Sequence, residues 1–150
     1  MTSFAGRAAG LTILLAWAGI AAAQAPCPAA DDVTQRELIG RWQATFADGR
    51  APRILKLWQH PELAASVRGE VERGDAVAAR APSPRPVLLA GDVNHGEFTL
   101  EESADGTHIS GTWIGQVTMP SCGKEITGTW TDEPDDPSRS PGFTLRKLEP

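Results

Sequence analysis

The chain has 150 residues, of which 41% are hydrophobic and 22% are charged, a composition typical of one globular domain. This composition excludes a collagen-like repeat, a coiled coil, a fully disordered chain and a multidomain enzyme. The formal net charge of −5, from 14 basic and 19 acidic residues, argues against a general nucleic-acid-binding protein.

Residues 1–23 have the pattern of a secretory signal peptide. Arg7 supplies a positive charge, a short apolar run follows it, and the small residues at 21–23 suit a cleavage site. The alternative, an uncleaved membrane anchor, is disfavoured because the run is short and rich in alanine and glycine. After cleavage, no other segment is long and apolar enough to span a bilayer. We therefore predict a periplasmic or secreted protein with an N-terminal segment at 24–37 and a folded domain at 38–150.

The two cysteines, Cys27 and Cys122, are predicted to form a disulfide, because exported proteins with an even cysteine count usually pair them. The bond would close a loop of about 96 residues and tie the proline-containing N-terminal segment to the domain. The alternative is a redox or metal-binding pair. The chain has no Cys-x-x-Cys motif, and no histidine stands beside either cysteine.

Alternation of apolar and polar residues predicts about eight short strands and no long helix. Before the first strand, Asp31 and Asp32 are placed to cap a short helical turn that runs through Leu38. The expected strands are 38–46, 53–59, 67–72, 87–93 and 97–103, two within 107–131, and 142–148. Prolines at alternate positions predict a loop at 76–86.

Two near-identical pentapeptides, 109–113 and 126–130, predict a hairpin with its tip near Pro120 and with Cys122 in an exposed loop. We expect each indole to cover a glycine on the facing strand. The expected opposite pairs are Trp113 with Gly128, Trp130 with Gly111, and Ile126 with Gly115.

A left-handed Gly106 before this hairpin would shift the register by one residue. The shift would let Phe98 and Leu100 share the inner face with Ile109 and Trp113. The predicted fold is therefore an all-β, antiparallel meander of about eight strands closed into a barrel, with a two-layer β-sandwich as the alternative.

The motif Gly-x-Trp occurs three times, at 40–42, 111–113 and 128–130. The first copy, on the first strand after a helical turn, resembles the opening of the calycin barrels, the lipocalins and avidin-like proteins, and the repeated Gly-Thr-Trp is also avidin-like. The resemblance implies that Arg146 packs over Trp42. The chain has no tyrosine, so the tyrosine expected in a biotin pocket and in the second lipocalin motif is missing, and the resemblance carries over no ligand.

Four tryptophans are the candidate ligand-binding residues. Trp42, Trp113 and Trp130 lie on inward faces, where they either line a pocket for an apolar ligand or fill the barrel; their pairing with glycines favours filling. Trp58 lies at a strand end beside a His-Pro turn and is the best single candidate for a contact residue.

The polar residues predict no metal, no cofactor and no catalytic site. His60, His95 and His108 are expected to be solvated histidines without metal-ligand spacing. The acidic stretch of Glu97, Glu101, Glu102 and Asp105 is expected to face solvent, as is the acidic loop at 132–136. No nucleophile or phosphate-loop motif is present.

The sequence therefore predicts an exported, non-enzymatic β-barrel protein that binds a small apolar molecule or an envelope partner protein. The alternative is a secreted inhibitor or accessory protein that acts through its loops on a protein target. The first hypothesis requires an open, partly apolar cavity at one end of the barrel. The second requires a filled barrel with exposed loops around Trp58 and 76–86.

Overall fold

The computed structural model describes residues 27–72, 85–132 and 140–149. The predicted signal peptide lies outside the described residues, as do most of the loop at 76–86 and most of the acidic loop at 132–136. No helix in the described part of the chain has the length and apolar character needed to cross a membrane.

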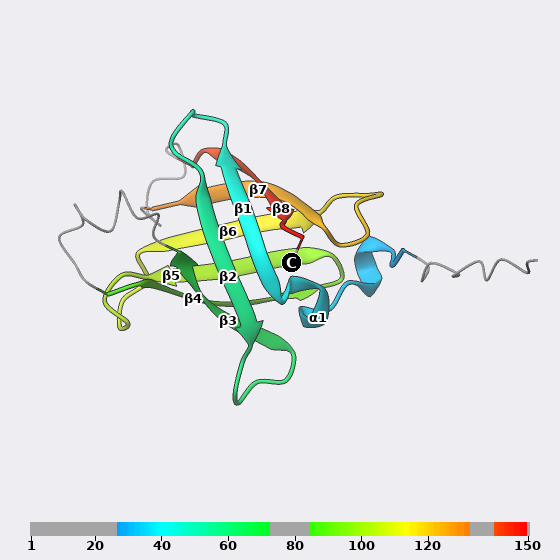
Figure 1. Ribbon diagram of the computed structural model, residues 1–150, viewed down its shortest axis with the longest axis horizontal. Helices are drawn as coiled ribbons and strands as arrows, with labels where there is room; N and C mark the ends of the chain where they lie inside the picture. The colour runs from blue at the N-terminus through cyan, green and yellow to red at the C-terminus, as the bar shows by residue number, and fades with distance from the viewer. Residues whose placement is uncertain (1–26, 73–84, 133–139, 150) are drawn as a thin grey trace, which may run out of the picture.

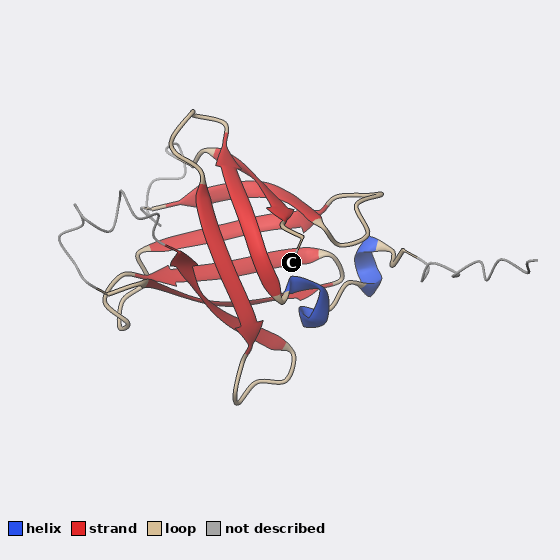
Figure 2. Cartoon of the chain, in the orientation of Figure 1, coloured by secondary structure: helices blue, strands red, loops and turns tan. Residues whose placement is uncertain are grey.

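Eight antiparallel strands form a closed barrel in which each strand pairs with its neighbours in sequence and β8 pairs with β1 (Figures 1 and 2). The predicted meander barrel is confirmed, and the sandwich alternative is excluded. The strands are β1 Gly40–Phe46, β2 Arg53–Gln59, β3 Ser66–Glu72, β4 Val87–Asn94, β5 Glu97–Ser103, β6 Gly111–Val117, β7 Glu125–Thr131 and β8 Gly142–Lys147.

A 3₁₀ turn, η1 (Ala30–Asp32), and one helical turn, α1 (Gln35–Leu38), lie against one end of the barrel. The Thr34 side chain accepts a hydrogen bond from the backbone N–H of Arg36, and the Glu37 carboxylate accepts one from the Thr34 N–H at 2.8 Å. This reciprocal arrangement is a capping box. The prediction that Asp31 and Asp32 cap this turn is wrong, because both lie in η1 and Thr34 directly precedes α1.

Apolar side chains at alternate positions fill the interior, as the period of two requires. The buried core residues are Val33, Leu38, Trp42, Ala44, Phe46, Leu55, Leu57, Val67, Leu89, Val93, Phe98, Leu100, Trp113, Val117, Ile126, Trp130, Phe143 and Leu145. Val33 comes from the N-terminal segment and Leu38 ends α1, so these two side chains close one end of the barrel with apolar contacts.

The hairpin of β6 and β7 forms, but its predicted register is wrong by two residues. Trp113 lies opposite Trp130, and Gly115 lies opposite Gly128 instead of Ile126. The paired glycines explain this register, since a Cβ atom on Gly128 would lie 2.0 Å from the Ile114 carbonyl oxygen. Only glycine permits so close an approach of the two backbones.

The register shift between β5 and β6 is confirmed. Gly106 has a φ of +82°, and Phe98 and Leu100 lie opposite Gly115 and Trp113. The inward placement of Ile109 is wrong: it precedes β6 and is 51% exposed. The reason is that Asp105 holds this part of the chain in a loop, its Oδ1 accepting hydrogen bonds from the backbone N–H groups of residues 107 and 108.

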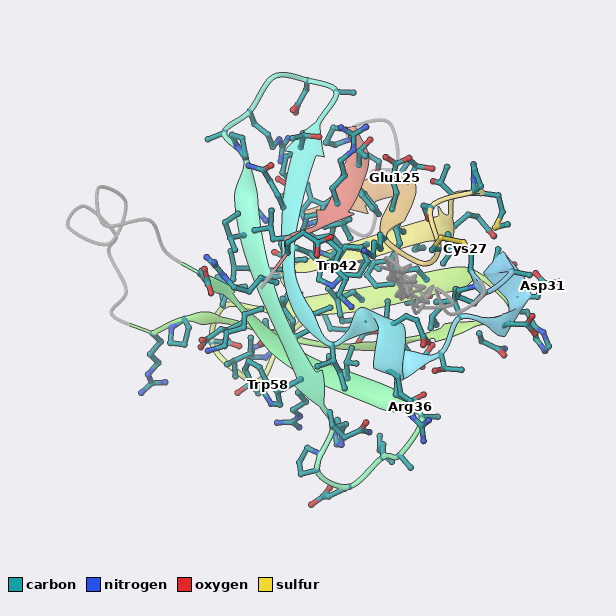
Figure 3. The ribbon with its side chains drawn as sticks, turned by 45° about the vertical axis from the view of Figure 1, so that its right-hand side comes forward. Cys27, Asp31, Arg36, Trp42, Trp58 and Glu125 are labelled. Atoms are coloured by element: carbon teal, nitrogen blue, oxygen red, sulfur yellow. A yellow bond between two sulfur atoms is a disulfide. The ribbon has the colours of Figure 1, made fainter. Side chains whose placement is uncertain are left out.

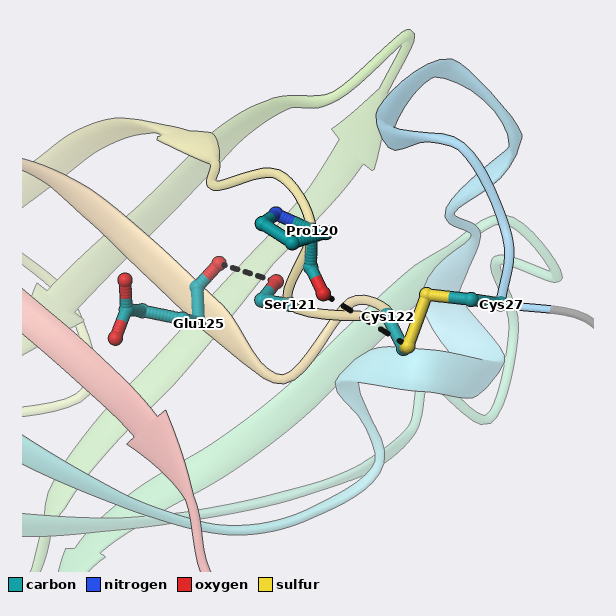
Figure 4. Close-up of a disulfide and its surroundings, with 5 residues drawn as sticks. All are labelled: Cys27, Pro120, Ser121, Cys122 and Glu125. Atoms are coloured by element: carbon teal, nitrogen blue, oxygen red, sulfur yellow. Dashed lines mark hydrogen bonds between the residues drawn. A yellow bond between two sulfur atoms is a disulfide. The ribbon is translucent and has the colours of Figure 1, made fainter.

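The predicted disulfide between Cys27 and Cys122 is confirmed, with a sequence separation of 95 (Figure 4). It joins the N-terminal segment to the loop between β6 and β7. Gly123 of this loop packs so closely against Val33 and Glu37 that an added Cβ atom would lie 3.2 Å from Val33. The disulfide therefore lies at the end of the barrel that Val33 and Leu38 close.

Candidate functional site

The three inward tryptophans lie in the core of the barrel. Trp42, Trp113 and Trp130 are at most 3% exposed. The ring of Trp113 packs 4.9 Å from Phe143 and 5.5 Å from Phe46, measured between ring centroids. These rings fill the interior, which is the arrangement that the second sequence-based hypothesis requires.

Glu102 is a buried carboxylate among these rings, only 4% exposed. The prediction that it faces solvent is wrong, because the alternation of β5 puts it on the inner face with Phe98 and Leu100. Its Oε1 accepts hydrogen bonds from Trp113 Nε1 at 2.8 Å and Trp130 Nε1 at 3.2 Å.

Two arginines complete this polar layer. Arg53 Nη1 donates to Glu102 Oε1 at 2.9 Å, and the guanidinium carbons of Arg50 and Arg53 each lie 4.6 Å from the centroid of Trp130. Arg50 in turn pairs with Asp48 at 2.7 Å. In the described residues, no buried side-chain nitrogen or oxygen lacks a hydrogen-bond partner. This layer therefore satisfies its own polar groups, and it covers the core at the end of the barrel opposite α1.

The expectation that Arg146 packs over Trp42 is wrong. Arg146 points outward and donates to Glu125 at 2.8 Å. Lys147 takes the place over the ring: its Nζ lies 5.6 Å from the centroid of Trp42 and donates to the backbone oxygen of Glu37. The alternation of β8 explains the exchange, since Leu145 and Lys147 share the inner face and Arg146 lies between them.

A pocket of about 270 Å³ lies on the outside of the barrel, over β2 to β5, with the loop between β5 and β6 as one wall. Its apolar lining includes Trp58, Leu88, Ala90 and Ile109, and its polar lining includes Arg68, Glu101, Ser103, Thr107 and His108. Trp58 is 39% exposed, Leu88 41% and Ile109 51%. In Figure 3, Trp58 lies beside β2 on the outside of the barrel and away from Trp42.

Four pocket residues form one row across four strands. Trp58 lies opposite Arg68, Arg68 lies opposite Ala90, and Ala90 lies opposite Glu101. Trp58 was the residue favoured from the sequence. The others were missed because this row depends on the pairing register of β2 to β5, which the sequence pattern alone does not fix.

His60 is buried, with 8% exposure, so the prediction of a solvated turn histidine is wrong. Its Nδ1 accepts hydrogen bonds from the backbone N–H groups of Glu62 and Leu63 at 3.1 and 3.0 Å. Its Nε2 lies 3.2 Å from Arg68 Nε. The ring therefore fixes the loop between β2 and β3 and stands beside the arginine of the outer pocket.

The two other histidines are exposed, as predicted. His95 has a φ of +48° in the two-residue turn between β4 and β5. His108 donates from Nδ1 to Asp105 Oδ2 at 2.8 Å, and this hydrogen bond raises the pKa of His108 and lowers that of Asp105. In the described ranges, no group of three His, Cys, Asp or Glu side chains is arranged to hold a metal ion.

A second pocket, of about 300 Å³, lies at the closed end beside the disulfide. Its lining includes Cys122, Arg36, Lys124 and Lys147. Partial burial lowers the pKa of Lys147, and the neighbouring charge of Lys124 acts in the same direction. Lys124 pairs with Glu149 at 3.1 Å, so part of the positive charge of this pocket is already neutralised.

Comparison with known proteins adds no family assignment. No protein-family model and no curated protein sequence matches the chain. Among solved structures, the chain is similar to a redesigned β-barrel, with 17% identity and a TM-score of 0.43, over 77% of this chain and 96% of that one.

Proposed function

We propose that this protein is an exported, non-enzymatic β-barrel protein that binds a small molecule in the outer pocket beside Trp58. The observation that carries the proposal is the exposed indole of Trp58, which shares one pocket with the exposed side chains of Leu88 and Ile109. An amphipathic ring beside other apolar groups, with a few polar groups converging on them, is the usual composition of a ligand site.

The interior of the barrel supports placing the ligand outside it. The indole N–H groups of Trp113 and Trp130 are already bonded to Glu102, and that of Trp42 is bonded to the Leu38 carbonyl at 2.7 Å. A ligand in the core would have to displace these partners. The outer pocket, at about 270 Å³, lies just below the common range of roughly 300–1,000 Å³ for ligand sites, which suits a small ligand.

The polar groups of the pocket support a binding role over a hydrolytic one. Ser103, Asp105 and His108 are close together, but Asp105 stands between the other two: its Oδ1 accepts from the Ser103 hydroxyl at 3.3 Å, and its Oδ2 accepts from His108. Activation of a serine needs the imidazole between the hydroxyl and the carboxylate. With Asp105 between the other two side chains, these hydrogen bonds stabilise the loop between β5 and β6.

Two further observations bear on export of the protein and on its relationship to the calycin barrels. The disulfide supports an oxidising compartment, in agreement with the signal-peptide pattern of residues 1–23. A relationship to the calycin barrels is supported by the Gly-x-Trp motif on β1 directly after α1 and by a cation over Trp42, although the cation is Lys147.

Fluorine NMR of the full chain labelled with 5-fluorotryptophan tests the binding proposal. The Trp58→Phe variant assigns the Trp58 resonance, and a library of small polar and apolar fragments is then added. We expect some fragments to shift the Trp58 resonance and to leave that of Trp42 in place. The proposal fails if no fragment moves Trp58, or if every fragment that does so moves Trp42 equally.

A matched pair of variants locates the site. Ile109 and Ile114 are both exposed, at 51% and 60%, but only Ile109 lines the pocket. We expect Ile109→Ala to weaken fragment binding at least fivefold and Ile114→Ala to change it less than twofold. Equal effects of the two variants contradict a site beside Trp58. If no fragment binds, and binding of a protein target depends on the outer loops, the alternative of an inhibitor or accessory protein is favoured.

A further inference from the structure

We infer that the ligand of the outer pocket is a small zwitterion with an apolar side chain, of the size and chemistry of an apolar α-amino acid. Its carboxylate would bind Arg68, its ammonium group would bind Glu101, and its side chain would lie against Trp58 and Ile109. The inference rests on the proposed binding function and adds to it the chemical class of the ligand.

Two charged side chains of the pocket lining, Arg68 and Glu101, are not paired with each other. The lining also includes Glu102 and His108, but Glu102 is paired with Arg53 and His108 is bonded to Asp105. Arg68 on β3 and Glu101 on β5 are both opposite Ala90 on β4. Two strand spacings of about 4.8 Å put their Cα atoms roughly 10 Å apart. The short side chain of Ala90 leaves the space between the two charges open to a ligand.

In the described residues, Arg68 has no carboxylate within ion-pair distance, as is also true of Arg36, Lys56 and Lys147. Arg41, Arg50, Arg53, Lys124 and Arg146 each pair with a carboxylate within 4.0 Å. In the described part of the chain, Arg68 has only His60 as a side-chain partner, and Glu101 has no side-chain partner. Both charges are therefore available to a ligand.

The contact with His60 leaves the charge of Arg68 uncompensated. His60 Nε2 lies 3.2 Å from Arg68 Nε. An imidazole ring carries no negative charge, so this contact does not compensate the charge of the guanidinium. The Nη groups remain for a carboxylate, which a guanidinium binds in bidentate fashion.

The two charges together select the ligand class. A simple anion would be attracted by Arg68 and repelled by Glu101. A simple cation would be attracted by Glu101 and repelled by Arg68. A zwitterion satisfies both groups. The apolar surfaces of Trp58, Leu88 and Ile109 then favour an apolar side chain over a polar one.

Three compounds test this inference in the same Trp58 fluorine experiment. Leucine carries both charges, N-acetylleucine lacks the ammonium group, and leucinamide lacks the carboxylate. We expect leucine to bind at least tenfold more tightly than either derivative. Similar affinities for the three compounds would overturn the inference.

Charge-removing variants assign each group. Arg68→Gln should weaken the binding of leucine at least tenfold and should not weaken that of leucinamide. Glu101→Gln should weaken the binding of leucine and should not weaken that of N-acetylleucine. Lys56→Gln and Glu97→Gln make the same charge changes at exposed positions of β2 and β5 outside the pocket, and each should change affinity less than twofold. Equal effects of pocket and control variants would overturn the assignment.

The outcomes separate this inference from the binding proposal. If uncharged fragments shift the Trp58 resonance and leucine does not, the pocket binds ligands, but the inference that its ligand is a zwitterion is wrong. If no compound shifts that resonance, the binding proposal itself fails.

Discussion

Both ends of the barrel place a cation over a tryptophan ring, yet the two ends satisfy the indole N–H in different ways. At the end that α1 covers, Trp42 donates to the carbonyl of Leu38, four residues earlier in the chain, and Lys147 lies over its ring. The acceptor is a neutral backbone group supplied by the same turn that closes the barrel.

At the opposite end, Trp113 and Trp130 share one acceptor, the carboxylate of Glu102. A buried carboxylate is costly unless a cation accompanies it, and Arg53 supplies that cation. At the α1 end the indole N–H is satisfied by a neutral backbone carbonyl, so this end closes without a buried charge. At the opposite end the acceptor is the Glu102 carboxylate, and its buried charge requires a cation, Arg53, from another strand.

The largest effect is expected at the α1 end, where the disulfide holds the closing segment. Replacing both Cys27 and Cys122 by serine removes a constraint on a loop of 95 residues. In the chain-entropy model this lowers the free energy of unfolding by about 4–5 kcal/mol. Urea unfolding of the double variant and the parent measures it. A loss below about 1 kcal/mol would show that packing of Val33 and Leu38 alone secures this end.

The next effect concerns the charged end. Glu102→Ala leaves Arg53 and two indole N–H groups without their acceptor, and we expect it to lower the free energy of unfolding by about 3–4 kcal/mol. Its neighbour Glu101 points outward, so Glu101→Ala should change stability by about 0.5 kcal/mol or less. Chemical denaturation of both variants gives the comparison, and similar losses would contradict the buried role of Glu102.

A smaller effect is expected from the cation over Trp42. Lys147→Met removes the charge over the ring and the donor to the Glu37 carbonyl, and it should cost about 1 kcal/mol. Lys124→Met removes a lysine whose partner, Glu149, is exposed, and should cost about 0.5 kcal/mol or less. Thermal unfolding of the two variants distinguishes them. If Lys124→Met is the more damaging change, the cation over Trp42 has no stabilising role.

The smallest effect is expected in the loop beside the Glu102 end. The hydrogen bond to Asp105 raises the pKa of His108 above 6.5, and Asp105→Asn should return it toward that value. Proton NMR titration of the His108 imidazole measures the change. An unchanged midpoint in this variant would show that the two side chains do not interact in solution.

The same pair predicts a pH dependence of stability. Because the pKa of His108 is raised on folding, its contribution is fully present below pH 6.5 and is lost as the pH rises through the folded pKa. Because the pKa of Asp105 is lowered from 3.8, its contribution is present above that value and is lost at more acidic pH. The parent should therefore exceed Asp105→Asn in stability at pH 5 by more than at pH 9.

The sequence predicts the strands and the closure well because both depend on local alternation. It misplaces Glu102, although its spacing from Phe98 and Leu100 puts it on the inner face, because a carboxylate within an acidic stretch suggests solvent. The acceptor role of Glu102 depends on Trp113 and Trp130, which reach it from other strands.

Other features of the site depend on contacts that no local pattern contains. The register of β6 and β7 is set by the approach of Gly128 to the Ile114 carbonyl, so Gly115 and Gly128 face each other. Trp130 still covers Gly111, where an added Cβ atom would lie 3.1 Å from the indole nitrogen. The burial of His60 depends on two backbone N–H groups of the following loop. Trp58 was identified because its exposure follows from its place at the end of a strand.

The pairing of β8 with β1 has a consequence for how any macromolecule meets this protein. Each of the eight described strands has hydrogen-bonded neighbours on both sides, so the sheet has no unpaired row of backbone N–H and C=O groups. A peptide therefore cannot bind to these strands by β-strand addition, which requires an exposed sheet edge. Recognition must therefore pass through side chains and loops, and substitutions of single surface residues are able to abolish it.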